Sequence, residues 1–393
     1  MLVSVATFCS SVAFYMNLPV LPLLILHLTR GNGVAWVGPV IGVTFAVAAI
    51  VNPIWGSLAD KYGRYPMMIR SVVAVGLVYV ATIFCTSVHE LLVLRVFNGL
   101  ASGFIPAATA LIAVHAPEGR TGTSMSYLSI ARNSGSLIGP SVGGVLLSVY
   151  GFRTVYAVAA AAGMVTLLTI LVIPRRFKAA PPKTEEQAAA QPTSRSWWRM
   201  DGAVNLPDVW WILTVSLMVA VAVAAIQTVL PLWLTHLGSQ GKALTGIAFT
   251  AGGAASLLTA LAWGKLTDRV GARKLSGPTL AAGGVLAGSL ALVSGLTPTV
   301  VAYVLFCLAI CEIGTILAVA LSEAAGSGNA GVAFGLNNTS IQAGQALGPV
   351  LVTSTAAFTG LQRSFAVPAA LLLAAGAGTL LLARARTGQQ RGH

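Results

Sequence analysis

The sequence has very little charge. Only 8% of its 393 residues are Asp, Glu, Lys or Arg, whereas 56% are hydrophobic. An ordinary soluble domain carries roughly 25% charged residues, so too few charges remain here to cover a water-facing surface. This composition excludes a soluble enzyme and a disordered chain. Acidic residues are the scarcest, at 10 against 23 basic ones. In a membrane protein such an excess marks cytoplasmic loops, and no nucleic-acid partner is needed to explain it.

Cysteine is also rare. All four cysteines lie in apolar stretches, where this residue usually behaves as a small apolar side chain. No disulfide framework, phosphate-binding loop, catalytic triad or zinc spacing stands out. We therefore expect no enzyme, no cofactor and no metal site, and we expect energy to come from an ion gradient rather than from ATP.

Long apolar runs separated by short polar breaks dominate the chain. Backbone groups in lipid must bond within their own segment, so these runs are expected to be helices, and about 20 residues cross the bilayer. The sequence predicts an all-α membrane protein with 12 transmembrane helices. The expected spans are 3–27, 35–58, 67–88, 91–114, 123–149, 154–174, 209–235, 243–263, 276–296, 299–321, 331–358 and 364–383.

The basic residues predict the orientation. If the first span runs outward, 17 of the 23 fall in inner loops, four in outer loops, and two, Arg95 and Arg132, within spans. Because positive charge accumulates on the cytoplasmic side, both termini are expected in the cytoplasm. We expect a multi-pass protein of the cell inner (cytoplasmic) membrane that acts as a monomer.

An internal repeat divides the chain. A shift of 209 residues places Gly135 on Gly344 and Gly139 on Gly348, and a shift of 208 superposes residues 56–64 on 264–272. We therefore expect two six-helix pseudo-repeats, 1–174 and 209–393, joined by a cytoplasmic linker, 175–208. Parallel repeats of this kind are typical of secondary transporters, whose substrate lies near mid-membrane between the halves.

The loop after the second span reads GSLADKYGR and resembles the G-x-L-x-D-x-x-G-R signature of the major facilitator superfamily. Its first glycine permits close helix approach and its last a tight turn, while its aspartate suits a helix N-terminus of the other half. We interpret this loop and its second copy as an inner gate; topology charge alone is the alternative. The predicted gate residues are Gly56, Asp60, Gly63, Arg64, Asp268 and Arg269.

Two further motifs carry the resemblance. The fifth span has a row of small residues that suits close packing, with a proline that bends the helix; it resembles a motif of proton-coupled exporters in this superfamily, and generic packing is the alternative. These structural residues are Gly135, Gly139, Pro140, Gly143 and Gly144. The fourth span resembles the R-x-x-Q-G motif of the same exporters, with Asn98 in place of Gln, which implies that Arg95 helps proton transfer.

Residues 54–160 are most similar to the MdtG-like branch of the 12-span drug:proton antiporters. The resemblance implies a proton-coupled multidrug exporter of small amphiphilic compounds that works by alternating access. The alternative is a dedicated exporter of a metabolite, such as a staphylopine-type metallophore or a siderophore. A non-transporting receptor or scaffold has no reason to bury charged residues within its spans.

One carboxylate, Glu312, is predicted to lie mid-span, in the tenth span. Burial favours its protonated form and a nearby arginine its ionised form, so it is the expected proton carrier; a structural ion pair is the alternative. Arg132 cannot release its proton, and it either holds an anionic substrate group or neutralises Glu312. Many drug antiporters have an acidic residue in the first span, where this chain has none, which favours neutral, zwitterionic or anionic cargo. The candidate substrate-binding residues are Arg132, Asn17, Tyr15, Gln227, Asn338 and Gln342; helix-to-helix hydrogen bonding is their alternative role.

Overall fold

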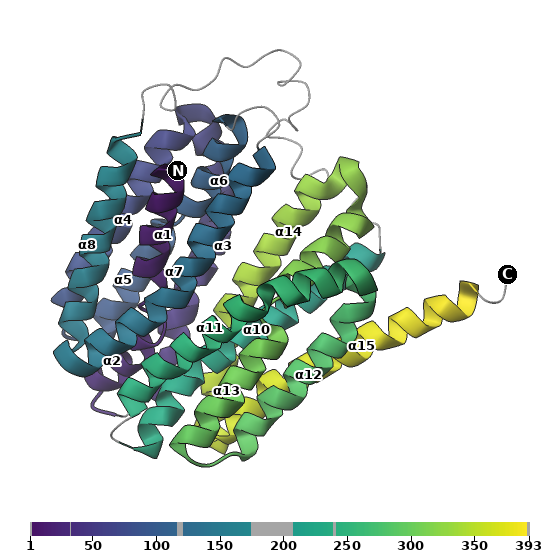
Figure 1. The fold of residues 1–393 in the computed structure, drawn as a ribbon. Coiled ribbons are helices and arrows are strands. Elements are labelled where there is room, and N and C mark those ends of the chain that lie inside the picture. Colours follow the sequence, from purple (N-terminus) through teal and green to yellow (C-terminus); the bar gives the residue numbers. More distant parts are fainter. Residues whose placement is uncertain (1, 32, 116–120, 174–206, 239–240, 391–393) are drawn as a thin grey trace. The chain divides into compact units, whose positions relative to one another are not determined.

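The computed structural model describes residues 2–31, 33–115, 121–173, 207–238 and 241–390 (Figure 1). Some side chains within its helices also lie outside the description, among them those of the predicted gate residues Asp60 and Asp268. Two compact units are present. Unit 1 comprises Met1–Gly33 and Val43–Trp198, and unit 2 comprises Val34–Gly42 and Arg199–His393. Most of the predicted linker lies outside the described residues.

Unit 1 is helical wherever its regular structure is described. Its helices are α1 (Leu2–Tyr15), α2 (Val20–Leu28), the larger part of α3 (Val34–Tyr62), α4 (Arg64–Ile83), α5 (Val88–Leu100), α6 (Phe104–His115), α7 (Thr121–Tyr150) and α8 (Phe152–Leu171). The predicted first span therefore consists of α1 with α2, and the fourth of α5 with α6.

Unit 2 repeats this pattern with longer helices. They are α10 (Pro207–Leu237), α11 (Gly241–Val270), α12 (Ala272–Leu292), α13 (Leu296–Ile310), α14 (Ile313–Thr359), the short 3₁₀ helix η3 (Arg363–Phe365) and α15 (Ala366–Gln390). The structure corrects one expectation here. The predicted loop between residues 321 and 331 is helical, so α14 includes part of the tenth span and the whole of the eleventh.

Among the described residues, nine stretches are long and apolar enough to cross a membrane. They coincide with nine of the predicted spans. The other three predicted spans, 123–149, 243–263 and 331–358, are helical too, within α7, α11 and α14. Each of these three helices contains residues whose side chains are not described.

A proline interrupts the first span. Pro19, between α1 and α2, has no backbone N–H with which to continue the helix. Beside it, the backbone N–H of Asn17 donates to the carbonyl of Phe14 at 3.2 Å, and the Asn17 Nδ2 donates to the carbonyl of Ala13 at 2.6 Å. Thr228 occupies the repeat position of Pro19, and α10 continues through it. The proline thus gives unit 1 a break that unit 2 lacks, and it places Asn17 there.

The fourth and tenth spans break at equivalent places. Trp55 Nε1 donates to the carbonyl of Leu100, the last residue of α5, at 2.9 Å. Trp263 Nε1 donates to the carbonyl of Leu308, near the end of α13, at 3.0 Å. The two tryptophans are 208 residues apart in the sequence, and so are the two leucines. Each unit therefore satisfies the carbonyl freed by its break with the same indole.

The two breaks differ in their other partners. In unit 1, Arg70 stacks on Trp55, with 3.5 Å between the guanidinium carbon and the ring centroid, and its Nη2 donates to the carbonyl of Ser102 at 2.5 Å. In unit 2, Glu312 stands at the break itself, directly before α14. The sequence predicted Glu312 within a continuous helix, and the structure corrects this, because the helical backbone is interrupted at Cys311 and Glu312.

Glycines set the distance between paired helices in both units. A Cβ on Gly135 of α7 would lie 2.5 Å from the Ser11 Cβ of α1, and one on Gly344 of α14 would lie 2.5 Å from the Ala220 Cβ of α10. Ser11 and Ala220 are themselves 209 residues apart. The same close packing of the fifth span on the first therefore recurs for the eleventh on the seventh, because small residues let the backbones approach.

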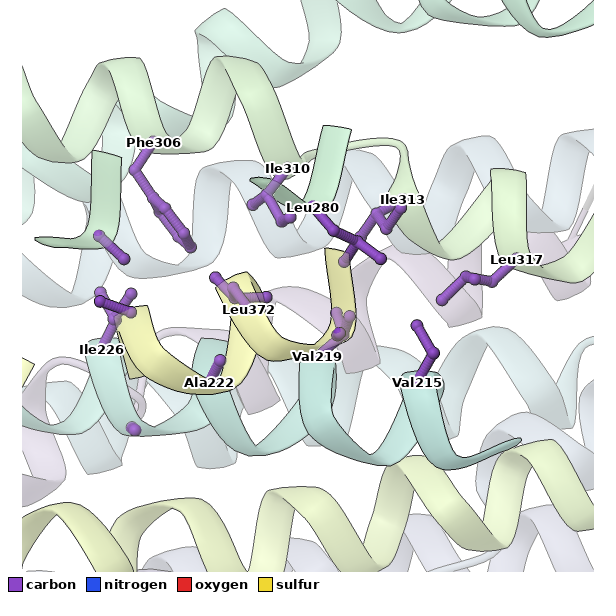
Figure 2. Packing of buried hydrophobic residues seen from close by; sticks show 14 of the residues in the cluster. Val215, Val219, Ala222, Ile226, Leu280, Phe306, Ile310, Ile313, Leu317 and Leu372 are labelled. Atoms are coloured by element: carbon purple, nitrogen blue, oxygen red, sulfur yellow. The ribbon is translucent and has the colours of Figure 1, made fainter. Parts of the chain in front are cut away.

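An apolar core fills unit 2 (Figure 2). Side chains at i, i+4, i+7 and i+11 of α10 form one stripe on a helix face, and α12, α13, α14 and α15 contribute residues that pack with it. The residues labelled in Figure 2 are Val215, Val219, Ala222, Ile226, Leu280, Phe306, Ile310, Ile313, Leu317 and Leu372. A second apolar cluster in unit 1 gathers residues from α1, α4, α6, α7 and α8, among them Met68 and Leu111.

Candidate functional site

Unit 1 contains a buried group of polar side chains around Tyr79 of α4. The Tyr79 hydroxyl lies beside the side-chain amides of Asn17, at the break in the first span, and of Asn98 on α5. Tyr156 of α8 is next to it, with ring centroids 6.3 Å apart. All four are at most 5% exposed. We call these four residues together with Arg95 the Arg95 cluster.

Arg95 is the charged member of this cluster. Its side chain is 4% exposed, its Nη2 donates to the hydroxyl of Thr82 at 3.5 Å, and its charge acts on both Tyr79 and Tyr156. The Thr44 hydroxyl donates to the Arg95 carbonyl at 3.1 Å and ties α3 to this turn of α5. Ionisable side chains within membrane helices are rare and usually functional.

The Arg95 cluster contains four buried polar atoms without a hydrogen-bond partner among the described residues. They are Nε of Arg95, Nδ2 of Asn98, Oδ1 of Asn17 and the hydroxyl of Tyr156. A buried polar atom left without a partner costs about 1–3 kcal/mol, and more when the group is charged. Burying these four atoms therefore lowers the folding stability of unit 1 unless another group provides their hydrogen bonds.

Tyr15 of α1 lies within electrostatic reach of Arg132 of α7, and Arg132 is exposed. The glycine packing brings the two helices together, since a Cβ on Gly139 would lie 2.9 Å from the Tyr15 Cβ and one on Gly143 would meet the Met16 carbonyl. The other structural residues of this motif, Pro140 and Gly144, are buried.

In unit 2, Glu312 is half-buried at the break of the tenth span. Its Oε2 accepts a hydrogen bond from the Thr315 hydroxyl at 2.8 Å. The residue is the N-cap of α14, although its side chain makes no capping hydrogen bond to the backbone.

The remaining predicted substrate-binding residues are spread over unit 2. Gln227 of α10 and Gln342 of α14 are half-buried, and Asn338 is exposed one turn before Gln342. No hydrogen bond joins any two of these three side chains in the described part of the chain. The structure therefore does not assemble them into a single polar group within unit 2.

The predicted gate loops are described only in part. Gly63 and Gly271, which are repeat mates, have φ values of +97° and +89°, a backbone conformation that glycine adopts without strain. Gly56 and its mate Gly264 have no atom of the described residues within 4 Å of an added Cβ, so the close helix approach at Gly56 stays a prediction. Arg64 is half-buried and Arg269 is exposed.

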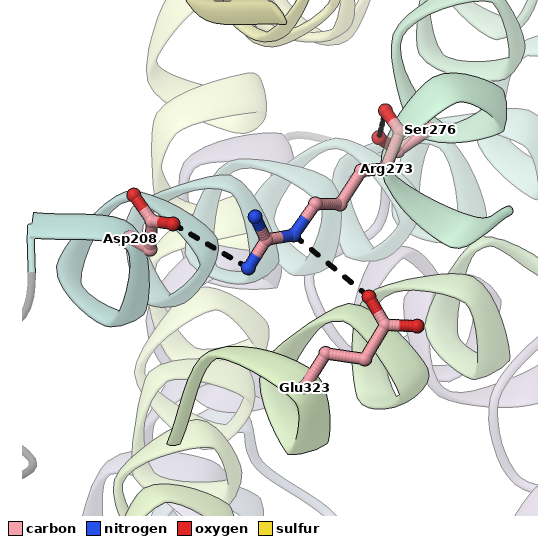
Figure 3. Close-up of polar contacts among 4 residues, drawn as sticks. All are labelled: Asp208, Arg273, Ser276 and Glu323. Carbon is pink, nitrogen blue, oxygen red and sulfur yellow. Dashed lines mark hydrogen bonds and ion pairs between the residues drawn. The ribbon is translucent and has the colours of Figure 1, made fainter. Parts of the chain in front are cut away.

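An ion triad in unit 2 was missed by the sequence analysis (Figure 3). Arg273 Nη2 lies 3.5 Å from Asp208 Oδ2, and Arg273 Nε lies 3.8 Å from Glu323 Oε2. One arginine therefore ties the start of α12 to the start of α10 and to α14. The tryptophans at the helix breaks were also missed, although Trp55 and Trp263 obey the same 208-residue shift as the loops that follow them.

Comparison with known proteins identifies the family. Residues 3–349 match the family model described as Major Facilitator Superfamily. The chain belongs to the major facilitator superfamily. It is thus a secondary transporter rather than an enzyme, a multi-pass membrane protein that binds a small-molecule substrate.

Among its relatives is Multidrug resistance protein MdtG of Rahnella sp. (strain Y9602), 30% identical over 378 residues, which are 94% of this chain and 89% of that protein. MdtG of Enterobacter lignolyticus (strain SCF1) is 31% identical over 381 residues, 94% of this chain and 88% of that one. The predicted resemblance is confirmed as distant homology over nearly the whole chain.

Solved structures of other transporters share the fold. A bacterial homologue of the human lysosomal transporter Spinster, inward-facing and unoccupied, aligns with a TM-score of 0.77 and 16% identity over 98% of this chain and 96% of its own. A POT family transporter in complex with 5-aminolevulinic acid aligns with a TM-score of 0.76 and 14% identity, over 97% and 95%. The predicted all-α major facilitator fold is confirmed.

Proposed function

We propose that this major facilitator is a proton-coupled multidrug exporter that moves small amphiphilic compounds out of the cell by alternating access. The observation that carries the proposal is the half-buried Glu312 at the break of the tenth span, in a chain that is similar to MdtG multidrug resistance proteins along nearly its whole length. Repeated binding and release of a proton needs a carboxyl group whose charged and neutral forms are both accessible.

The surroundings of Glu312 leave it open to proton exchange. Its Oε2 accepts a hydrogen bond from the Thr315 hydroxyl, and the side chain is only half-buried at the N-terminus of α14. A backbone break also leaves local freedom that a regular helix lacks. Arg95, in unit 1, is proposed to support proton transfer as the superfamily motif implies.

The charge of the cargo can be inferred from the arginine within the fifth span. Arg132 is exposed beside Tyr15, and a fixed guanidinium repels cations and attracts carboxylates and phosphates. The first span offers Tyr15 and Asn17 where a cation-selective transporter would place a carboxylate. We propose neutral, zwitterionic or anionic cargo, with Gln227, Asn338 and Gln342 as further contacts. If only lipophilic cations compete for export, this part of the proposal is wrong.

The transport experiment uses purified protein in proteoliposomes with an imposed pH gradient. We expect Glu312→Gln to abolish gradient-driven export of a fluorescent amphiphile while binding of the compound remains. The matched control is Glu323→Gln, which removes one carboxylate from the same helix, at the ion triad, and should keep the gradient dependence. Unchanged coupling in Glu312→Gln would refute the proton-carrier role.

The orientation is part of the same proposal. The excess of basic residues in alternate loops supports cytoplasmic termini in the inner membrane, and the loops around Gly63 and Gly271 would then form the cytoplasmic gate with Asp60 and Asp268. Labelling of single cysteines introduced near each terminus, from the outside of intact cells, should fail unless the membrane is opened.

A further inference from the structure

The Arg95 cluster has a charge that no carboxylate described in unit 1 neutralises. An arginine side chain remains protonated in a protein. Glu90 is the one carboxylate of unit 1 whose side chain is described, and it is committed elsewhere, because its Oε2 accepts hydrogen bonds from the backbone N–H groups of Thr86 and Ser87 in the capping box of α5. No ion pair reaches Arg95 from the described residues.

The internal repeat shows that the scaffold does not require these polar residues. The repeat mates of Asn17, Tyr79, Arg95, Asn98 and Tyr156 are Ile226, Ala287, Tyr303, Phe306 and Phe365. All five mates belong to the packed apolar core of unit 2, where Figure 2 labels Ile226 and Phe306. The same fold is thus built without a charge at this place. Because an apolar core of similar volume is usually at least as stable as a buried polar one, unit 1 has a reason beyond packing to keep the charge.

The atoms without partners define the missing ligand. Nε of Arg95 and Nδ2 of Asn98 can only donate hydrogen bonds, and the Tyr156 hydroxyl can also donate. The acceptor Oδ1 of Asn17 is the exception among the four atoms. Arg95 and Asn98 are three residues apart on α5, so they share one helix face. Donors around an uncompensated positive charge suit an anion and exclude a cation.

The burial of the cluster limits what can bind to it. Tyr79, Arg95, Asn98 and Tyr156 are each at most 5% exposed, so a ligand would be enclosed by these side chains rather than open to solvent. We propose that Arg95, Asn98 and Tyr156 bind a small inorganic anion of the size of chloride. The anion would neutralise the guanidinium within the membrane span, and it is separate from the cargo proposed beside Arg132.

The test measures thermal unfolding of the detergent-purified protein while chloride replaces gluconate at constant ionic strength. We expect the unfolding temperature to rise with chloride and to saturate, and we expect bromide to substitute for chloride. Arg95→Gln should unfold at the same temperature in both salts. Arg132→Gln is the matched control, because it removes the other arginine from within a span, and it should keep the wild-type chloride dependence.

Direct binding keeps the proposal testable if Arg95→Gln does not fold. Radiolabelled chloride should bind to the wild-type protein at about one ion per chain, and Asn98→Leu, which removes one donor, should weaken its affinity about tenfold. Equal unfolding temperatures in chloride and gluconate would mean that water alone fills the cluster, and would overturn the proposal. Loss of the chloride effect in Arg132→Gln, or its persistence in Arg95→Gln, would overturn it as well.

Discussion

Replacing a glycine on the packed face of α7 by alanine should change the stability of the protein, and two opposing terms decide the sign of that change. In Gly139→Ala, the new Cβ would lie 2.9 Å from the Tyr15 Cβ, 3.0 Å from the Met16 backbone N and 3.0 Å from the Val12 carbonyl O. All three are backbone or Cβ atoms of the first span, so no change of rotamer can relieve the contact. Overpacking of this kind costs about 1–3 kcal/mol.

The opposing term is helix propensity. Replacing glycine by alanine within a helix stabilises it by about 0.5–1 kcal/mol, so, with both ranges taken at their middle, we expect Gly139→Ala to be destabilised by a net amount of about 1 kcal/mol. Gly76, inside α4 of the same unit, has no atom within 4 Å of an added Cβ. Gly76→Ala should therefore retain only the favourable term and become more stable.

The assay is thermal unfolding of the purified variants in one detergent, where 1 kcal/mol corresponds to about 2–4 °C for a unit of about 200 residues. The unfolding temperature should fall for Gly139→Ala and rise for Gly76→Ala. The unfolding temperature of Gly348→Ala should also fall. Gly348 and Val221 both belong to unit 2, and the new Cβ would lie 2.5 Å from the Val221 carbonyl O. A Gly139→Ala variant at least as stable as the wild type would refute the close packing of α7 on α1.

Two further predictions concern polar contacts. Trp263→Phe should lower the free energy of unfolding by about 1–3 kcal/mol, since it leaves the Leu308 carbonyl without its indole donor. Trp55→Phe should lower it by less, because Arg70 Nη1 is a second donor to the Leu100 carbonyl at 3.5 Å. The reverse order in denaturant titrations would contradict this. Glu323→Gln should cost less than about 1 kcal/mol, and less still at high salt, because a half-exposed ion pair is weak and screened; Arg273 and Glu323 are 47% and 52% exposed. A loss larger than that of Trp263→Phe, or a loss that salt does not reduce, would show that the ion triad does more than surface pairing.

Local residue chemistry made several parts of the site predictable. The small residues from Gly135 to Gly143 predict close helix packing from the local sequence. A glycine has no side chain to keep a neighbouring helix away, whatever the rest of the fold does. The same holds for Gly63, since a left-handed turn between two helices needs glycine whatever the rest of the fold does. Gly56 shows the limit of this reasoning, because close approach also needs a neighbour, and no neighbour is described there.

The helix breaks were not predictable from hydropathy. The stretches around Asn17, Leu100 and Glu312 are as apolar as continuous helices. Pro19 was a visible signal for the first break, yet Pro140 lies within α7 without interrupting it. A helix break is tolerated when other groups form hydrogen bonds with the backbone carbonyls that it leaves free. The donors here, such as Trp55 and Trp263, come from a different span.

By itself, the sequence determined the helical membrane fold, the two repeats and the charge asymmetry of the loops. Each of these follows from the summed properties of many residues, which no single contact can reverse. Only the tertiary structure decided that Arg95, Asn98 and Tyr156 share one buried cluster, that Tyr15 lies within electrostatic reach of Arg132, and that Arg273 lies between Asp208 and Glu323. These arrangements join residues from different helices, and their distances depend on how glycine faces and apolar stripes bring those helices together.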